Sequence, residues 1–361
     1  MIKFVDEYRN PALCLKASEK IKAISKKKIK IMEVCGGHTM AIRKNGLNKL
    51  VGGNINFISG PGCPVCVTAL QDVDTAIALS KLEGITVCTF GDLFYVPGSS
   101  FSLAESKSDG ADVRVVYSVD DALSLAERQR DKKVIFISIG FETTAPTVAA
   151  AILRAQREGI DNFYILGLNK TMPAALRAIL GSGDTKIDAL ICPGHVSTIT
   201  GIEIYRFIVE EFKIPCCVCG FEPLDIMTGV YILAGLSEEN RPELVNAYKR
   251  VVRDEGNKKA QSIMREVFEE TDAPWRGIGL IPSSGLKLRD PYKRFEAREN
   301  FDIDVPLAKE NPGCICGEVL RGVKMPVDCP LFAKACSPSR PQGACMVSSE
   351  GVCGAWYKYG D

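Results

Sequence analysis

The sequence has few of the residues and motifs that several common functions require. Its 361 residues include two histidines and two tryptophans, and aromatic residues make up 7% of the chain. Its thiol motifs have no Ser/His/Asp order, P-loop or GxGxxG run nearby, so hydrolase, NTPase and dinucleotide functions are not indicated. Basic and acidic residues nearly cancel, at 45 and 44. The chain therefore has no excess charge that would favour nucleic acid or an anionic membrane as a partner.

Long apolar runs are also lacking. No stretch approaches the roughly 18 apolar residues of a membrane span. The first ten residues, MIKFVDEYRN, carry charges where a signal peptide needs an apolar core. We therefore expect a cytoplasmic protein without a membrane partner. In that reducing compartment, 15 cysteines indicate metal binding or thiol chemistry rather than a disulfide framework.

Short Val/Ile-rich runs that end in glycine turns and lead into helical patterns predict an α/β fold with mostly parallel strands. The runs are KIKIMEVCGGHT, INFISGPGCPV, GITVCTFGD, KKVIFISIGFETTAP, NFYILGLNKTMP, DALICPGHVST and IPCCVCGFEPLD. In such sheets the ligand crevice lies outside the carboxyl ends of the strands. We therefore expect the chemistry at these turns.

A weak internal repeat predicts two similar parallel-sheet α/β/α units, over 22–130 and 131–230. EVCGGHT resembles ISIGFETT, SGPGCPV resembles ICPGHVS, and TFGDLF resembles VCGFEPL, in the same chain order. Convergent turn chemistry is the alternative explanation. Residues 231–361 are expected to form a helical, cysteine-rich iron–sulfur domain that packs with the N-terminal segment 1–21. Within it, apolar spacing predicts helices over 241–252 and 260–268.

Six cysteines gather in the glycine- and proline-rich tail. Four of them are separated by 14, 6 and 16 residues: Cys314, Cys329, Cys336 and Cys353. Two more are left over: Cys316 and Cys345. Four thiolates can hold tetrahedral zinc or a [4Fe-4S] cluster. These gaps lack the short knuckles of structural zinc sites, so the spacing favours the cluster and leaves zinc open.

Cys35 follows a predicted strand in EVCGGHT, and His38 lies three residues further on. The other histidine, His195, also follows a glycine at a predicted strand end. An exposed thiolate at Cys35 would be a nucleophile or a soft metal ligand. For the histidines, a functional and a structural role are both open.

Cys63 and Cys66 form a CxxC motif in GPGCPVC, directly before a predicted helix that closes at Gly84. Thiols at a helix start gain thiolate character, which suits redox exchange, and inert buried cysteines are the alternative. The remaining cysteines in or near strands are interpreted mainly as core: Cys88, Cys192, Cys216, Cys217 and Cys219.

Taken in order, these motifs resemble the HypD family of hydrogenase maturation factors. The resemblance rests on CGGHT, GPGCPVC, GFETTAP, CPGHVSTI, GFEP and the tail ending CMVSSEG, and runs from about residue 30 to the C-terminus. It implies an assembly scaffold for the Fe(CN)2CO unit of [NiFe]-hydrogenases. Such a scaffold works with a small HypC-type chaperone and with HypE, which brings cyanide.

The resemblance also implies roles for individual residues. Cys35 is similar to an iron ligand, with His38 beside it, and Cys63 and Cys66 match a thiol redox pair. The tail residues that match [4Fe-4S] ligands are Cys314, Cys329, Cys336 and Cys353. Those that match a second redox pair beside the cluster are Cys316 and Cys345.

From these roles we hypothesise an electron relay from the cluster through Cys316/Cys345 and Cys63/Cys66 to the Cys35 site. Four further residues are expected in the same crevice, where they would bind cyanide nitrogen or move protons, although such carboxylates often only cap helices: His38, Glu142, Asp92 and Glu222. The apolar stretch 90–103 is a candidate docking surface, with a buried loop as the alternative.

Two other functions are also compatible with the sequence. The protein could be an iron–sulfur-dependent protein disulfide reductase, which would turn over dithiols without Cys35. It could also be a zinc-stapled binding module with inert thiols, which would be colourless.

Overall fold

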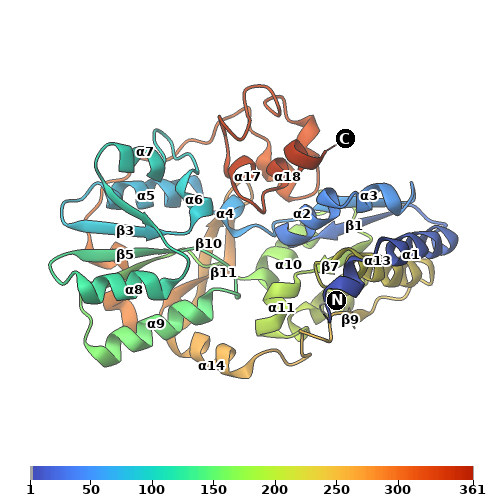
Figure 1. Ribbon diagram of the computed structural model, residues 1–361, viewed down its shortest axis with the longest axis horizontal. Helices are drawn as coiled ribbons and strands as arrows, with labels where there is room; N and C mark the ends of the chain where they lie inside the picture. The colour runs from blue at the N-terminus through green and yellow to red at the C-terminus, as the bar shows by residue number, and fades with distance from the viewer. Residues whose placement is uncertain (1–2, 361) are drawn as a thin grey trace.

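The computed structural model describes residues 3–360 and contains two parallel sheets, one antiparallel hairpin and a tail of short helices (Figure 1). The α/β class predicted from the strand–turn–helix pattern is confirmed. The five-stranded sheet has the order β2 (Ile55–Ser59), β1 (Ile29–Glu33), β7 (Ala189–Cys192), β8 (Cys216–Val218), β9 (Leu244–Asn246). The four-stranded sheet has the order β4 (Asp112–Val115), β3 (Ile85–Thr89), β5 (Lys133–Ser138), β6 (Phe163–Gly167).

The strand order differs from the contiguous units expected over 22–130 and 131–230. β1 and β2 lie in the five-stranded sheet beside β7 and β8, whereas β3 and β4 pair with β5 and β6 in the other sheet. Each range therefore contributes strands to both sheets. The turns after β2 and β7, which look like repeats of each other, belong to one sheet. Turn motifs identify where a strand ends, but strand pairing is decided by contacts that are distant in sequence.

Alternate residues along each strand face different helices. On the Ile31 side of the five-stranded sheet lie α1 (Pro11–Ile24), α2 (Gly36–Lys44), α3 (Leu47–Leu50) and α13 (Pro223–Glu238). On the Met32 side lie α10 (Met172–Ser182), α11 (Gly194–Thr200) and α12 (Arg206–Phe212). The core on the Met32 side continues into the four-stranded sheet. One hydrophobic core therefore joins the two sheets.

The four-stranded sheet is covered on both faces as well. On the Phe136 side lie α8 (Val119–Arg128) and α9 (Ala145–Glu158). On the Val87 side lie α5 (Leu70–Ser80), α6 (Gly91–Phe94) and α7 (Leu103–Ser108). Burial on both faces explains why these strands read as continuous apolar runs rather than as alternating patterns.

The N-terminal segment packs on the five-stranded sheet's helical layer. After a 3-10 turn, η1 (Asp6–Arg9), the Asn10 side chain accepts hydrogen bonds from Ala12 and Leu13 and so begins α1. Helix α1 lies along α13. The sequence predicted that segment 1–21 packs with residues 231–361. Helix α13 meets this prediction only in part, because only its second half lies within that range. Residues 1, 2 and 361 of these predicted segments lie outside the described residues.

The range 231–361 is less helical than expected. Helix α14 (Lys258–Val267) agrees with the prediction, but β10 (Phe268–Trp275) and β11 (Gly279–Leu288) form an antiparallel hairpin. The prediction of a helix across 241–252 is wrong. That stretch forms β9 and a turn, because Leu244 pairs with Cys216 of β8 and Asn246 Nδ2 donates to Val252 O at 3.0 Å. Sheet pairing here overrides the helical spacing.

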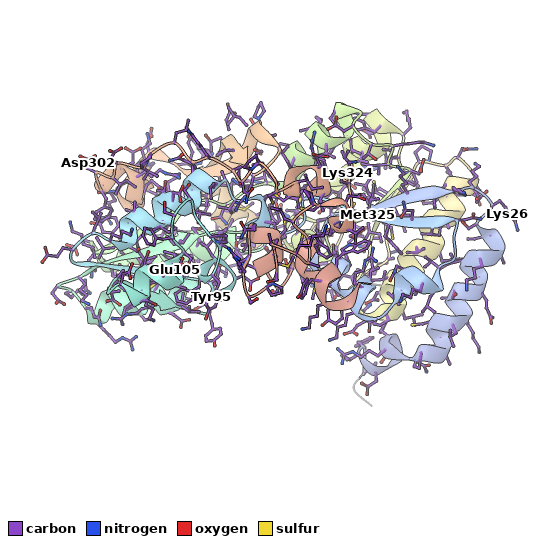
Figure 2. The ribbon with its side chains drawn as sticks, turned by 90° about the horizontal axis from the view of Figure 1, so that it is seen from above. Lys26, Tyr95, Glu105, Asp302, Lys324 and Met325 are labelled. Carbon is purple, nitrogen blue, oxygen red and sulfur yellow. A yellow bond between two sulfur atoms is a disulfide. The ribbon has the colours of Figure 1, made fainter. Side chains whose placement is uncertain are left out.

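The tail lies between the two sheets, over the end of α2 (Figure 1). Its elements are α16 (Cys316–Leu320), η4 (Pro326–Asp328), α17 (Ala344–Val347) and α18 (Val352–Tyr359). Helix α18 packs along α2, with the Arg43 guanidinium 3.6 Å from the centre of the Trp356 ring. Figure 2 shows Lys324 and Met325 of the tail between Tyr95 on one side and Lys26 on the other.

The remaining short elements complete the chain: α4 (Pro64–Val67), η2 (Glu203–Tyr205), η3 (Asp290–Phe295) and α15 (Ala297–Asn300). Among residues 3–360, no helix has both the length and the apolar character of a membrane span.

Candidate functional site

Two predicted motifs meet at the carboxyl ends of β1 and β2. Cys35 follows β1 and caps α2, and Gly62 follows β2. Gly36 N donates to Gly62 O at 3.1 Å, and a Cβ on Gly62 would lie 2.3 Å from the Cys35 nitrogen. No side chain larger than hydrogen fits there. The CGGH and GPGCPVC turns are therefore in backbone contact, as neighbouring parallel strands require.

The CxxC motif forms the start of α4. Cys63 and Cys66 are joined by a disulfide, and Cys66 N also donates to Cys63 Sγ at 3.1 Å. The two residues are only 1% and 0% exposed. The pair is thus held at a strand end, as predicted, but is shielded from solvent.

A segment of the tail, residues 348–350, lies on both turns. Ser348 Oγ is 3.4 Å from Cys63 Sγ, and a Cβ on Gly36 would lie 2.4 Å from the backbone oxygen of Glu350. Helix α17, which carries Cys345, packs against α4. The tail therefore touches the CGGH turn and the CxxC pair at one place, although Ser348 lies 285 residues after Cys63 in the sequence.

Asp92 fixes this tail segment to α6. Its Oδ2 accepts hydrogen bonds from Ser348 Oγ at 3.0 Å, Ser349 N at 3.1 Å and Ser349 Oγ at 2.8 Å. Asp92 is partly exposed, whereas Ser348 is buried. Of the four residues expected in the crevice, Asp92 is thus connected to the thiols through Ser348.

Burial governs the chemistry of Cys35. The sequence predicted an exposed thiolate, but the residue is only 6% exposed. Burial raises the pKa of the Cys35 thiol to about 12, and the nearby Glu350 carboxylate adds to this effect. At neutral pH the group is therefore a thiol, and a cation that binds the sulfur must displace its proton.

His38 is held as a neutral imidazole. Its Nε2 lies 3.2 Å from Cys219 O and 3.1 Å from Gly220 O, so this nitrogen carries the proton and donates. Burial lowers the pKa of His38 to about 4. The ring stacks on Phe221, which stacks in turn on His195. Nδ1 is buried and has no hydrogen-bond partner among the described residues.

Glu142 and Glu222 have other neighbours. Glu142 Oε1 accepts from Met172 N at 2.9 Å at the start of α10, and burial raises the pKa of Glu142 to about 7. This residue lines a cavity of about 290 Å³ beside α14 and the hairpin. Glu222 begins α13 and forms a bidentate ion pair with Arg9 near the surface. Both carboxylates take part in helix starts, which was the alternative role for them.

All six tail cysteines line one apolar cavity: Cys314, Cys316, Cys329, Cys336, Cys345 and Cys353. Thiols without competing carboxylates suit a soft metal or an iron–sulfur cluster in donor chemistry. The cavity itself measures about 20 Å³. Within residues 3–360, no three or more Cys, His, Asp or Glu side chains have a metal-binding arrangement. The donor set fits a cluster, and the side chains have to rearrange to hold one.

Sequence reasoning missed Arg276 at the tip of the hairpin. Its backbone N donates to Val67 O of α4 at 2.9 Å, and its guanidinium pairs with Glu310 at 2.9 Å. The residue is 4% exposed, and Cys316 and Cys345 lie within range of its charge. The basic residue in the PWRGIG stretch was the available signal, but it gains meaning only once the hairpin is folded.

Glu33 was also missed, although a charge within an apolar strand marks it. Its Oε1 accepts from Ser59 Oγ at 2.7 Å, and burial raises the pKa of Glu33 to about 7.

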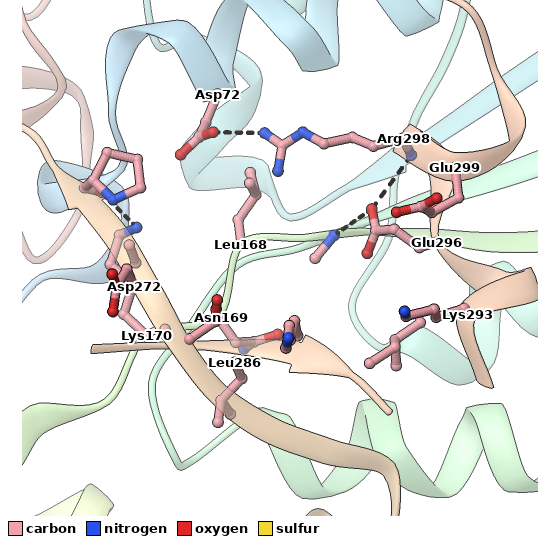
Figure 3. Close-up of a pocket in the computed structure, with 17 residues that line it drawn as sticks. Asp72, Leu168, Asn169, Lys170, Asp272, Leu286, Lys293, Glu296, Arg298 and Glu299 are labelled. Carbon is pink, nitrogen blue, oxygen red and sulfur yellow. Dashed lines mark hydrogen bonds and ion pairs between the residues drawn. The ribbon is translucent and has the colours of Figure 1, made fainter. Parts of the chain in front are cut away.

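A second cavity, of about 280 Å³, lies between the end of β6 and the hairpin (Figure 3). There Asp72 pairs with Arg298 at 2.6 Å, and Lys170 donates to Pro274 O. None of the predicted site residues lines it.

Comparison with known proteins agrees with the motif order. The sequence pattern of HypD, described as the hydrogenase formation hypA family, matches residues 12–360. The chain belongs to the HypD family. The hydrogenase maturation factors HypD of Rhizobium leguminosarum and Escherichia coli are 45% and 43% identical to it, each over 99% of this chain. The alignments cover 96% and 98% of those two proteins.

A putative hydrogenase expression/formation protein of Methanocaldococcus jannaschii is 45% identical over 96% of the chain and 97% of its own length. The resemblance inferred from the motifs is therefore confirmed. HypD family membership extends over the two sheets, the hairpin and the cysteine-rich tail alike, since the match runs from α1 to α18.

Proposed function

We propose that the protein is a [NiFe]-hydrogenase maturation factor on which the Fe(CN)2CO unit is assembled. The observation that carries this proposal is the meeting of the CGGH turn, the CxxC pair and tail residues 348–350 at one place. Family membership supports it, because the named relatives are hydrogenase maturation factors. The iron unit is the cargo, and the chain provides its ligand and its electrons.

Cys35 would bind the iron. Thiolate is a soft, electron-donating ligand, which suits low-spin iron that carries cyanide and carbon monoxide. Because the Cys35 thiol keeps its proton at neutral pH, iron binding must release that proton. The unprotonated Nδ1 of His38 is an acceptor, since Nε2 donates to the two backbone oxygens. His38 would therefore accept a hydrogen bond or bind a metal rather than donate to cyanide nitrogen.

Electrons would reach Cys35 through two thiol pairs. A [4Fe-4S] cluster on Cys314, Cys329, Cys336 and Cys353 would supply them one at a time. Cys316 and Cys345 would then reduce the disulfide of Cys63 and Cys66 by thiol–disulfide exchange. The packing of α17 on α4 supports exchange between the pairs, because α17 carries Cys345 and α4 begins at the CxxC motif.

The proposed partners are a small HypC-type chaperone and HypE as cyanide donor. Part of the segment 90–103 is exposed, which supports the proposed docking role for that part. Tyr95 and Phe101 are 62% and 40% exposed, whereas Leu93 and Val96 are buried. Tyr95 directly follows α6, whose Asp92 binds the tail segment on the thiol turns. A partner bound there would be close to the proposed iron site.

A disulfide reductase acting on other proteins receives less support. Such an enzyme needs a pair that a protein substrate can reach, and Cys63 and Cys66 are almost fully buried. Burial favours exchange within the chain or with a partner that opens the site.

Infrared spectroscopy of the anaerobically purified complex with the two partners tests the proposal. We expect cyanide and carbon monoxide stretching bands in the wild type and their loss in Cys35→Ser. Cys14→Ser, a buried cysteine of α1, is the matched control and should keep the bands. Unchanged bands in Cys35→Ser would reject Cys35 as the iron ligand.

A further inference from the structure

Reduction of the buried CxxC pair requires protons as well as electrons. The disulfide takes up two electrons and two protons to become two thiols. Cys63 is 1% exposed, so water does not reach its sulfur freely. An unpaired thiolate left in that apolar surrounding is costly. A route for protons to Cys63 is therefore part of the chemistry.

We propose that Ser348 and Asp92 form this route. Ser348 Oγ lies 3.4 Å from Cys63 Sγ and donates to Asp92 Oδ2 at 3.0 Å. Ser348 is 4% exposed, while Asp92 is partly exposed and borders solvent. The chain of polar atoms thus runs from a buried sulfur to a carboxyl that exchanges protons with water. The inference rests on the proposed redox role of the pair.

The orientation of Ser348 is set by its surroundings. Its Oγ accepts a hydrogen bond from Glu350 N at 3.2 Å while its own proton points to Asp92. The second lone pair of Ser348 Oγ is left to accept a hydrogen bond from Cys63. A thiol at Cys63 would donate there, which gives a continuous S–H to O–H to carboxylate chain for proton release. Reversal of the same chain delivers a proton during reduction.

A dithiol reductant opens the pair in two exchanges. A thiolate of the reductant attacks Cys66 Sγ, the Cys63–Cys66 bond breaks, and the electron pair remains on Cys63. Cys63 is the better leaving group because Cys66 N donates to its sulfur. Asp92 first takes a proton from water. The Ser348 hydroxyl then turns toward Cys63, gives its proton to the sulfur and takes the Asp92 proton in return, which leaves Asp92 ionised again. The second thiol of the reductant then attacks the mixed disulfide and releases Cys66, which takes the second proton.

Three variants separate proton transfer from simple anchoring of the tail. Ser348→Ala removes the link to Cys63. Asp92→Asn keeps an oxygen that can accept from both serines but holds no transferable acid proton. Ser349→Ala is the matched control, because it removes the shorter bond to Asp92, at 2.8 Å, and leaves Ser348 and its contact with Cys63 in place.

The test is the rate at which dithiothreitol reduces the pair in the full chain, followed by quenched alkylation and mass spectrometry of the Cys63–Cys66 peptide. We expect Ser348→Ala and Asp92→Asn to slow reduction by roughly a factor of 100 and to lose the wild-type solvent isotope effect, with Ser349→Ala unchanged. Equal slowing in Ser349→Ala, or wild-type rates in the other two, would overturn the route. A wild-type pair that stays closed both with dithiothreitol and with a one-electron donor to the tail, such as reduced methyl viologen, would instead reject the proposed redox role.

Discussion

Burial, more than pairing with opposite charge, controls the protonation of Cys35, His38 and two buried carboxylic acids. It raises the pKa of Glu33 and Glu142 to about 7 and that of Cys35 to about 12, and it lowers the pKa of His38 to about 4. Each of these groups is therefore driven toward its neutral form. A site of neutral donors and acceptors suits a cargo that arrives with its own charge.

Glu142 gives a testable pH dependence. Its folded-state pKa is raised from 4.5 to about 7, so its contribution to stability is complete below pH 4.5 and is lost as the pH rises through 7. The difference corresponds to about 3 kcal/mol. We expect Glu142→Gln, which keeps the acceptor for Met172 N, to lose that much less stability than the wild type between pH 4.5 and pH 8.

Urea unfolding of wild type and variant at both pH values gives the measurement. Glu33 changes the pH dependence of stability in the same direction as Glu142, and His38 changes it in the opposite direction. Because both residues are present in both proteins, the difference between wild type and variant reports Glu142 alone. Identical pH dependence in both proteins would show that the pKa of Glu142 is not raised by folding.

At the scale of elements, glycine at position 62 allows the two thiol turns to touch. A Cβ there would lie 2.3 Å from Cys35 N, within the backbone of the neighbouring turn. We expect Gly62→Ala to lower the free energy of unfolding by at least about 2 kcal/mol, because the backbone contact leaves no room to relax. Gly53→Ala is the matched control, since a Cβ there meets no atom within 4 Å.

Chemical denaturation monitored by circular dichroism compares these two glycine variants with the wild type. The control should change stability by less than about 0.5 kcal/mol. If Gly62→Ala is as stable as Gly53→Ala, the CGGH and GPGCPVC turns are not in the contact described here.

The local elements could be predicted from sequence much better than their partners. Cys35 and Cys63 were expected at strand ends because an apolar run followed by a glycine turn is a local signal, and both lie there. The pairing of β1 with β7 and the position of Ser348 on Cys63 had no such signal. They depend on contacts between residues more than 150 positions apart. The 241–252 stretch failed for a related reason, since its pairing with β8 is a contact outside the stretch that helical spacing does not reveal.

At the scale of the whole molecule, the tail connects the two sheets at their thiol-bearing edge. Helix α18 packs on α2, α17 packs on α4, and residues 348 and 349 bind Asp92 of α6. The cysteine-rich tail thus contacts both the proposed iron site and the CxxC pair. The central claim is that this arrangement passes electrons from the tail to the Cys63–Cys66 disulfide.

The redox state of Cys63 and Cys66 in Cys345→Ser tests this claim most directly. The chain is purified anaerobically, its iron and sulfide are measured, a one-electron donor such as reduced methyl viologen is added, and free thiols are counted by alkylation and mass spectrometry. We expect about four iron and four sulfide per chain in wild type, Cys345→Ser and the core control Cys88→Ser. The disulfide should open in wild type and in Cys88→Ser and stay closed in Cys345→Ser. Equal opening in Cys345→Ser, or a colourless wild-type protein that holds zinc, would contradict the account.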